Sequence, residues 1–138
     1  MTNIIKVNTA SPLEKVASYS RLIVVDNWIY VSNTAGRNPE TKLIPDDLIE
    51  QTEQVFSNIE KALKVVNASL QDVVMSRVFI QTPADTHQVM EYIGTKFKGV
   101  NPATTVTNPS LGSQAYKVEL EVTAYRGAGN ATIQQISI

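Results

Sequence analysis

The fold of this chain is decided by Pro102-Ala103-Thr104-Thr105-Val106 and, after a loop, by Val118-Glu119-Leu120-Glu121-Val122. Successive side chains of a strand point to opposite faces of a sheet, so the valines and the leucine of the second run reach a core. Glu119 and Glu121 then share the other face. Carboxylates in this position must be satisfied by water, by a neighbouring subunit or by a ligand. The pattern therefore predicts an interface or a cleft on the acidic face.

The composition is that of one globular domain covering residues 1–138, with 43% hydrophobic and 18% charged residues. A net charge of −1 provides no basic surface for nucleic acid, so nucleic-acid binding is not expected. The absence of cysteine excludes disulfides and thiolate sites. No apolar run is long enough for a membrane span, and the N-terminus lacks the apolar region of a signal peptide. We therefore expect a cytoplasmic protein that does not bind membranes.

Hydrophobic periodicity predicts two helices and six strands. A helical stripe runs from 47 to about 67, with Asp47 and Glu50 at the spacing of a capping box, and a second helix begins at Asp85 and Gln88 and ends near Gly99. Ser11 to Glu14 is interpreted as a turn or loop, and Asp26-Asn27 as a tight hairpin turn. The expected strands are 4–7, 22–25, 28–32, 73–81, 103–108 and 116–125.

This element order predicts an α+β fold, a mixed β-sheet with two helices on one face. The other face of the sheet would be open, and a sheet of this kind commonly buries its open face by oligomerising. For the tail, 127–138, the sequence leaves two alternatives, a further strand of the sheet or a loose end.

Most familiar catalytic constellations are missing from the sequence. The single histidine, His87, is interpreted as a solvated residue in the first turn of the second helix. A zinc site needs several His or Cys ligands, and no glycine-rich phosphate-binding motif follows a strand. We therefore expect no metal and no cofactor.

The two opening segments, together with Tyr19-Ser20-Arg21 and Trp28-Ile29-Tyr30-Val31-Ser32, resemble the Rid (YjgF) family of small trimeric proteins. The resemblance extends from about Ser18 to Arg126. It implies a chorismate mutase-like (YjgF-like) fold, a homotrimer whose three sheets form a barrel, and clefts for a small-molecule ligand between adjacent subunits. Members are named for deaminating reactive enamines and imines. Some relatives have been described as ribonucleases, an activity that the net charge disfavours here.

The resemblance also assigns roles to residues. By spacing, Glu119 matches the glutamate that positions the attacking water, and Tyr19 and Ser32, thirteen residues apart, match residues that line the cleft. Deaminating members hold the substrate carboxylate with an arginine directly after Pro-Ala, fifteen residues before that glutamate. Thr104 occupies this position here. A hydroxyl supplies no cation, so we expect weaker binding of a free carboxylate.

Several interpretations remain open for these residues. Glu119 either orients a water or binds an amine, or it is satisfied within a subunit interface. Trp28 and Tyr30 pack between subunits or on a sheet face. Arg21 lies two residues from Tyr19, so an extended segment would point both to one face. Arg21 then either supplies the missing cation from another direction or is a surface arginine at the start of a strand.

Three functions are compatible with this pattern. The first is deaminase-like hydrolysis of a small enamine, imine or related nitrogenous metabolite, with Glu119 as the catalytic residue and Tyr19, Ser32, Thr104 and Arg21 binding the substrate. The second is a non-catalytic protein of the same fold that binds a small metabolite or regulates. The third is an interaction protein whose trimer surface binds a partner. We place the hydrolase first because the rest of the cleft pattern is retained.

Overall fold

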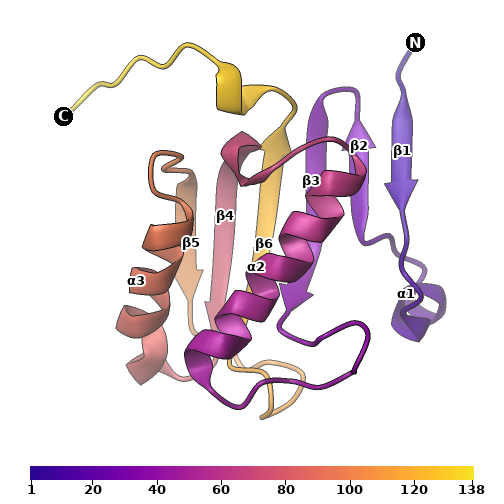
Figure 1. The fold of residues 1–138 in the computed structure, drawn as a ribbon, viewed down its shortest axis with the longest axis vertical. Coiled ribbons are helices and arrows are strands. Elements are labelled where there is room, and N and C mark those ends of the chain that lie inside the picture. Colours follow the sequence, from indigo (N-terminus) through magenta and orange to yellow (C-terminus); the bar gives the residue numbers. More distant parts are fainter.

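A six-stranded mixed sheet with two long helices on one face forms the molecule (Figure 1), in a computed structural model that describes residues 1–138. The strand order is β1-β2-β3-β6-β4-β5, and every neighbouring pair is antiparallel except β4 and β5. The strands are β1 (Ile4–Val7), β2 (Leu22–Val25), β3 (Trp28–Ala35), β4 (Val73–Ile80), β5 (Ala103–Thr107) and β6 (Val118–Tyr125). The helices are α1 (Pro12–Ala17), α2 (Leu48–Val65) and α3 (Thr86–Lys96), with short 3₁₀ turns η1 (Leu70–Asp72), η2 (Pro83–Asp85) and η3 (Ala128–Asn130). The predicted α+β fold, a mixed sheet with two helices on one face, is confirmed.

Helix α2 begins as the sequence predicts. The Asp47 side chain accepts hydrogen bonds from the backbone N–H groups of Ile49 and Glu50, at 3.1 and 3.0 Å. These bonds satisfy two of the N–H groups that have no partner within the helix. The apolar stripe of α2 packs against the sheet, and Phe56 meets the Phe97 ring edge-on at the end of α3. The two helices therefore form one layer over one face of the sheet.

Two local predictions are wrong. Residues 11–14, expected to form a turn or loop, instead begin helix α1 (12–17), because Pro12 at the first position has the backbone angle of a helix, and Ser18 ends the helix in the left-handed conformation (φ 56°). Asp85 makes no capping bond to α3. Pro83 starts a 3₁₀ turn that holds Asp85 in a helical conformation (φ −83°, ψ −11°), whereas a capping residue is normally extended.

The core lies between the helices and the sheet and contains 21 buried hydrophobic residues. Strand β6 lies inside the sheet, between β3 and β4, with Val118, Leu120 and Val122 buried. Glu119 and Glu121 lie on the opposite face, as predicted. That face is open: Trp28 and Tyr30 are 44% and 48% exposed. No helix covers these aromatic side chains.

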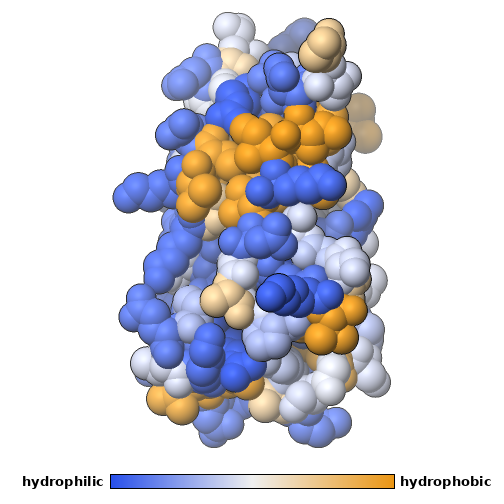
Figure 2. Space-filling model, turned by 90° about the vertical axis from the view of Figure 1, so that its right-hand side faces the viewer, coloured by the Kyte–Doolittle hydropathy of each residue, from blue (hydrophilic) through white to orange (hydrophobic).

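The edges of the sheet and the tail complete the fold. Strands β1 and β5 have a neighbour on one side only. The β1 side of the molecule carries an apolar patch in its upper half (Figure 2). Ile4 and Ile5 of β1 are exposed. After η3, residues 131–138 form neither helix nor strand, so the tail does not extend the sheet.

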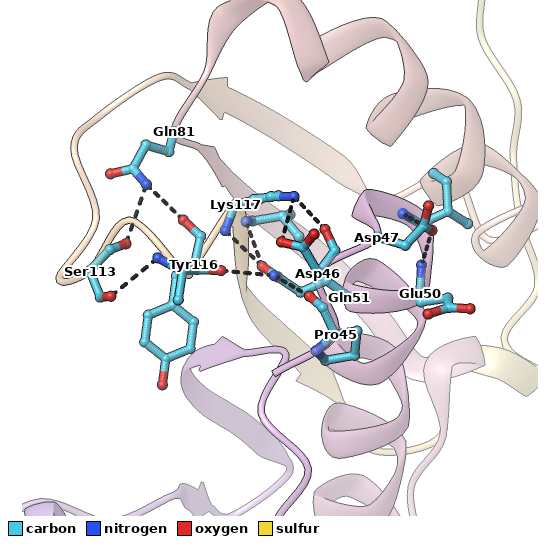
Figure 3. A network of polar contacts seen from close by, with 12 residues as sticks. Pro45, Asp46, Asp47, Glu50, Gln51, Gln81, Ser113, Tyr116 and Lys117 are labelled. Atoms are coloured by element: carbon cyan, nitrogen blue, oxygen red, sulfur yellow. Dashed lines mark hydrogen bonds and ion pairs between the residues drawn. The ribbon is translucent and has the colours of Figure 1, made fainter. Parts of the chain in front are cut away.

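A buried glutamine fixes the start of β6 (Figure 3). Gln51 of α2 has no exposed surface, and its Nε2 donates to the carbonyl oxygens of Pro45 and Ala115, at 2.9 and 3.0 Å. Its Oε1 accepts hydrogen bonds from the backbone N–H groups of Lys117 (2.7 Å) and Val118 (3.4 Å). One side chain therefore holds two loops against α2, directly before Glu119.

Candidate functional site

A β-bulge in β3 creates the centre of the candidate site. Val31 pairs with Val122 of β6 and Thr34 pairs with Leu120, so β3 has one more residue than β6 between the two pairs. The extra residue interrupts the alternation at Ser32-Asn33 and leaves Asn33 exposed beside β6. Its Nδ2 donates a hydrogen bond of 2.7 Å to Oε1 of Glu119. Sequence reasoning missed Asn33; the available signal was the run of three polar residues, Ser32-Asn33-Thr34, in a strand that begins with large apolar side chains.

Glu119 is a half-buried carboxyl on the open face. Its direct neighbours across the sheet are Ala35 of β3 and Phe79 of β4, whose side chains cannot form hydrogen bonds. The one hydrogen bond of the Glu119 side chain comes from Asn33. Burial raises the pKa of Glu119 above its ordinary value, and the positive charge of Arg21 offsets part of this rise. The second carboxyl oxygen has no partner in the chain, so this group is able to accept and return a proton.

Arg21 lies at the same place and has no ion-pair partner. Its Nη2 donates to the backbone carbonyl of Asn33 at 3.0 Å, and its Cζ is 5.9 Å from the centre of the Tyr19 ring. No carboxylate oxygen lies within 4.0 Å of the guanidinium, and the buried Nε has no hydrogen-bond partner. Arg21 is therefore a half-buried cation with unused donors.

A second carboxyl, Glu14 of α1, is also influenced by the charge of Arg21. Burial alone would raise the pKa of Glu14, but hydrogen bonds from Thr9 and Asn8, together with the charge of Arg21, hold it below the ordinary value. The carboxylate accepts from the backbone N–H of Thr9 at 2.8 Å and from the Thr9 hydroxyl at 2.5 Å. Both carboxylate oxygens of Glu14 are therefore hydrogen-bonded to the loop before α1. The backbone carbonyl of Glu14 accepts from the N–H of Tyr19 at 3.0 Å, which fixes the segment that leads to Tyr19.

Tyr19 and Ser32 line one open pocket of about 340 Å³ on the same face, together with Lys6, Ile23 and Tyr30. The Ser32 hydroxyl donates to the carbonyl oxygen of Ser20 at 2.7 Å, and the Ser32 N–H donates to the carbonyl of Arg21 at 3.0 Å. These bonds fasten the segment before β2 to β3. The structure thus brings together four of the predicted site residues: Tyr19, Arg21, Ser32 and Glu119.

Thr104 lies elsewhere within the chain. It pairs with Ser76 of β4, and the two hydroxyl oxygens are 2.9 Å apart. Ser76 is fully buried and therefore belongs to the helix-covered face, whereas Glu119 lies on the open face. Strand β4 also separates β5 from β6. A single copy of the chain does not place Thr104 beside Glu119.

The remaining candidate features are the single histidine, possible metal ligands and a second pocket. His87 is 90% exposed on α3, with its Nε2 3.8 Å from Glu91. No three His, Asp or Glu side chains gather where they could bind a metal ion. A second pocket of about 260 Å³, between the start of β5 and the tail, is lined by no ionisable side chain. None of the helices has both the length and the apolar character needed to cross a lipid bilayer.

Comparison with known proteins agrees with this architecture. The profile of the family described as "Endoribonuclease L-PSP" matches residues 9–126. A mouse protein named 2-iminobutanoate/2-iminopropanoate deaminase is 28% identical over 130 residues, covering 92% of this chain and 96% of the mouse protein. A RutC family protein of Pyrococcus abyssi is 31% identical over 112 residues, covering 80% and 88%.

Solved structures show the same fold. A Mycobacterium tuberculosis member of the YjgF/YER057c/UK114 family superimposes with a TM-score of 0.80 at 27% identity, covering 89% of this chain and 99% of that one. The profile match covers Tyr19, Arg21, Ser32, Asn33 and Glu119, both long helices and every strand except β1. The chain therefore belongs to the endoribonuclease L-PSP family, the Rid (YjgF) family that its sequence resembles.

Proposed function

We propose that this protein hydrolyses a small imine, or the imine tautomer of an enamine, to a carbonyl compound and ammonia. The observation that carries the proposal is Glu119, a half-buried carboxyl with a raised pKa and one free oxygen on an open face. The names of the mouse and rat relatives, 2-iminobutanoate/2-iminopropanoate deaminase, support the same reaction class.

In the proposed reaction, the Glu119 carboxylate takes a proton from water as the water oxygen bonds to the imine carbon. The electron pair of the C=N bond moves to nitrogen, which takes the proton from Glu119 and leaves a carbinolamine. Glu119 then moves the hydroxyl proton to nitrogen. The C–N bond breaks, ammonia leaves with the electron pair, and the carbonyl forms. Imine and water become carbonyl and ammonia, and the carboxylate is regenerated.

We further propose that the site is completed in a homotrimer. The open face exposes Trp28, Tyr30 and Tyr125, which are costly to leave in water and are typical of an interface. Thr104 lies at the opposite side of the sheet from the pocket, so only another copy would bring it to the cleft. Sedimentation velocity tests this directly: we expect a species of three times 15.2 kDa, and a monomer would overturn the assembly.

A second candidate is a protein that binds the same ligand without turnover. It is favoured by Thr104, where the resemblance places an arginine, because the threonine hydroxyl is already bonded to Ser76 and to the carbonyl of Pro102. This position provides no cation to hold a substrate carboxylate in a reactive pose.

Ammonia release from freshly generated 2-iminopropanoate distinguishes the two. We expect acceleration by the wild-type protein and a loss of about 10²–10⁴-fold in Glu119→Gln, the range for a general base. Glu121→Gln is the matched control, because Glu121 lies on the same face of the same strand but pairs with Arg77 at 3.1 Å. An active Glu119→Gln variant would overturn the mechanism. An inactive wild type that binds the product would favour the binding protein.

A further inference from the structure

We propose that Arg21 is the anion-binding residue of this site and holds the carboxylate of a 2-imino acid beside Glu119. The inference rests on the proposed function and adds to it the residue of this chain that would hold the substrate carboxylate, in place of the arginine that deaminating relatives carry. It replaces the arginine that the sequence lacks at Thr104 with a cation from the other end of the chain.

The first support is the set of unused donors on Arg21. A guanidinium carries five N–H donors, and the side chain of Arg21 uses one of them, from Nη2 to the carbonyl of Asn33. The Nε is buried and has no partner. Buried donors in native structures are nearly always satisfied, so an unsatisfied one beside a pocket indicates a missing acceptor. A carboxylate matches the planar fork of a guanidinium better than any other common ligand group.

The second support is the absence of a competing anion within the chain. The charge of Arg21 lowers the pKa of two carboxyls, Glu14 and Glu119, yet neither carboxyl lies within 4.0 Å of the guanidinium. The oxygens of Glu14 are occupied by Thr9 and Asn8, and Asn33 holds one oxygen of Glu119. The cation is therefore near both carboxyls but paired with neither, and an incoming carboxylate would not have to displace a partner.

The third support is the spacing that a 2-imino acid requires. Its carboxylate is attached directly to the imine carbon, so the anion site and the proton-transferring group must be close neighbours. Asn33 provides this closeness, because its backbone carbonyl accepts from Arg21 while its side chain donates to Glu119 at 2.7 Å. Within one chain, Thr104 is on another face and does not meet this requirement.

The pocket itself is suited to an anion. Tyr19 lies against the guanidinium, with Cζ 5.9 Å from the ring centre, which restricts the orientation of the fork. Lys6, on the pocket wall, makes no ion pair and adds a second positive charge. Arg21 and Glu119 are not among the lining residues of this pocket, which adjoins them through Tyr19 and through Ser32, the residue before Asn33.

The test compares a carboxylate with its neutral analogue. Pyruvate, the product expected from 2-iminopropanoate, and pyruvamide are titrated by calorimetry into the wild type and into Arg21→Met, Arg21→Lys and Arg77→Met. We expect Arg21→Met to weaken pyruvate binding at least tenfold and pyruvamide binding less than twofold. Arg21→Lys keeps the charge but loses the fork and should lie between. Arg77→Met is the control, since Arg77 is paired with Glu121 on the same face.

Each outcome separates this inference from the proposed function. If Arg21→Met selectively loses pyruvate binding while the wild type releases no ammonia from 2-iminopropanoate, the role of Arg21 is supported and the hydrolase is refuted. Turnover of 2-iminopropanoate by Arg21→Met with kcat/KM within twofold of wild type would refute Arg21 and leave the hydrolase standing. Failure of the wild type to bind pyruvate, or a loss of assembly in Arg21→Met with unchanged pyruvate affinity, would also overturn the inference. Arg21→Lys extends the test if the methionine variant does not fold.

Discussion

Replacing Gln51 with leucine should destabilise the protein strongly, although leucine is as good a helix former as glutamine. The leucine side chain is similar in volume and remains compatible with the buried site, so packing changes little. What is lost is the polar clamp: bonds to the carbonyls of Pro45 and Ala115 and from the N–H groups of Lys117 and Val118. The effect of the change is therefore electrostatic and not steric.

The magnitude follows from which partners regain water. The two carbonyls belong to loops, and each loses a net hydrogen bond worth about 1 kcal/mol. The Lys117 N–H, bonded at 2.7 Å, becomes an unsatisfied donor at about 1–3 kcal/mol, while the 3.4 Å contact to Val118 adds little. We expect the free energy of unfolding to fall by about 3–5 kcal/mol.

Urea unfolding at one fixed protein concentration measures this loss, with the midpoint expected to fall while the slope is unchanged. Gln54→Leu is the matched control, because Gln54 lies one turn away on α2 and bonds only to the side chain of Asn58. A loss below about 1 kcal/mol for Gln51→Leu, or an equal loss for both variants, would refute the clamp. The general expectation that buried polar groups must be satisfied underlies the estimate.

Three further predictions follow from the site. Burial raises the pKa of Glu119 in the folded protein, so ionisation of Glu119 opposes folding above its unfolded pKa. Glu119→Gln should therefore be more stable than wild type at pH 7 and should lose this advantage as the pH falls. Thermal melts across pH 3–8 check this. Glu14 has the opposite sign: its lowered pKa stabilises the fold above the unfolded pKa, so Glu14→Gln should be less stable at pH 7, with the difference disappearing on acidification in the same melts. In the proposed trimer, where another copy brings Thr104 to the cleft, Thr104→Arg should raise kcat/KM for 2-iminopropanoate in the ammonia assay, whereas Thr105→Arg, one residue along the strand and on the opposite face, should not.

The elements predicted correctly from the sequence are those fixed by local rules. The alternation of residues 118–122 and the cap at Asp47 depend on neighbours within a few positions, so the chain itself contains the information. The Asp85 cap depends on the same kind of rule and was wrong, because Pro83 imposed a competing 3₁₀ turn first. Here the tendency of Pro83 to start a turn and the tendency of Asp85 to cap a helix compete, and the sequence alone does not show which one prevails.

The candidate site was predictable in part. The resemblance placed Tyr19, Ser32 and Glu119 in one site, and the structure brings these three residues to one face. Asn33 was missed because its role arises from a bulge, which requires knowing how β3 pairs with β6 across 86 positions of sequence. Gln51 was missed for the same reason, since three of its four partners are 64 to 67 residues away.

The arrangement of Arg21, Asn33 and Glu119 explains why the chain separates two opposite charges that are free to attract each other. A direct ion pair would lower the pKa of Glu119 and occupy the guanidinium, leaving neither group available to a ligand. An amide between them, accepting from the cation through its backbone and donating to the carboxyl through its side chain, holds both in place without neutralising either. In the proposed reaction Glu119 changes its protonation state while the guanidinium of Arg21 stays charged, and the separation leaves both groups free to contact a ligand. The bulge that positions Asn33 therefore links the cation and the carboxyl of the proposed site.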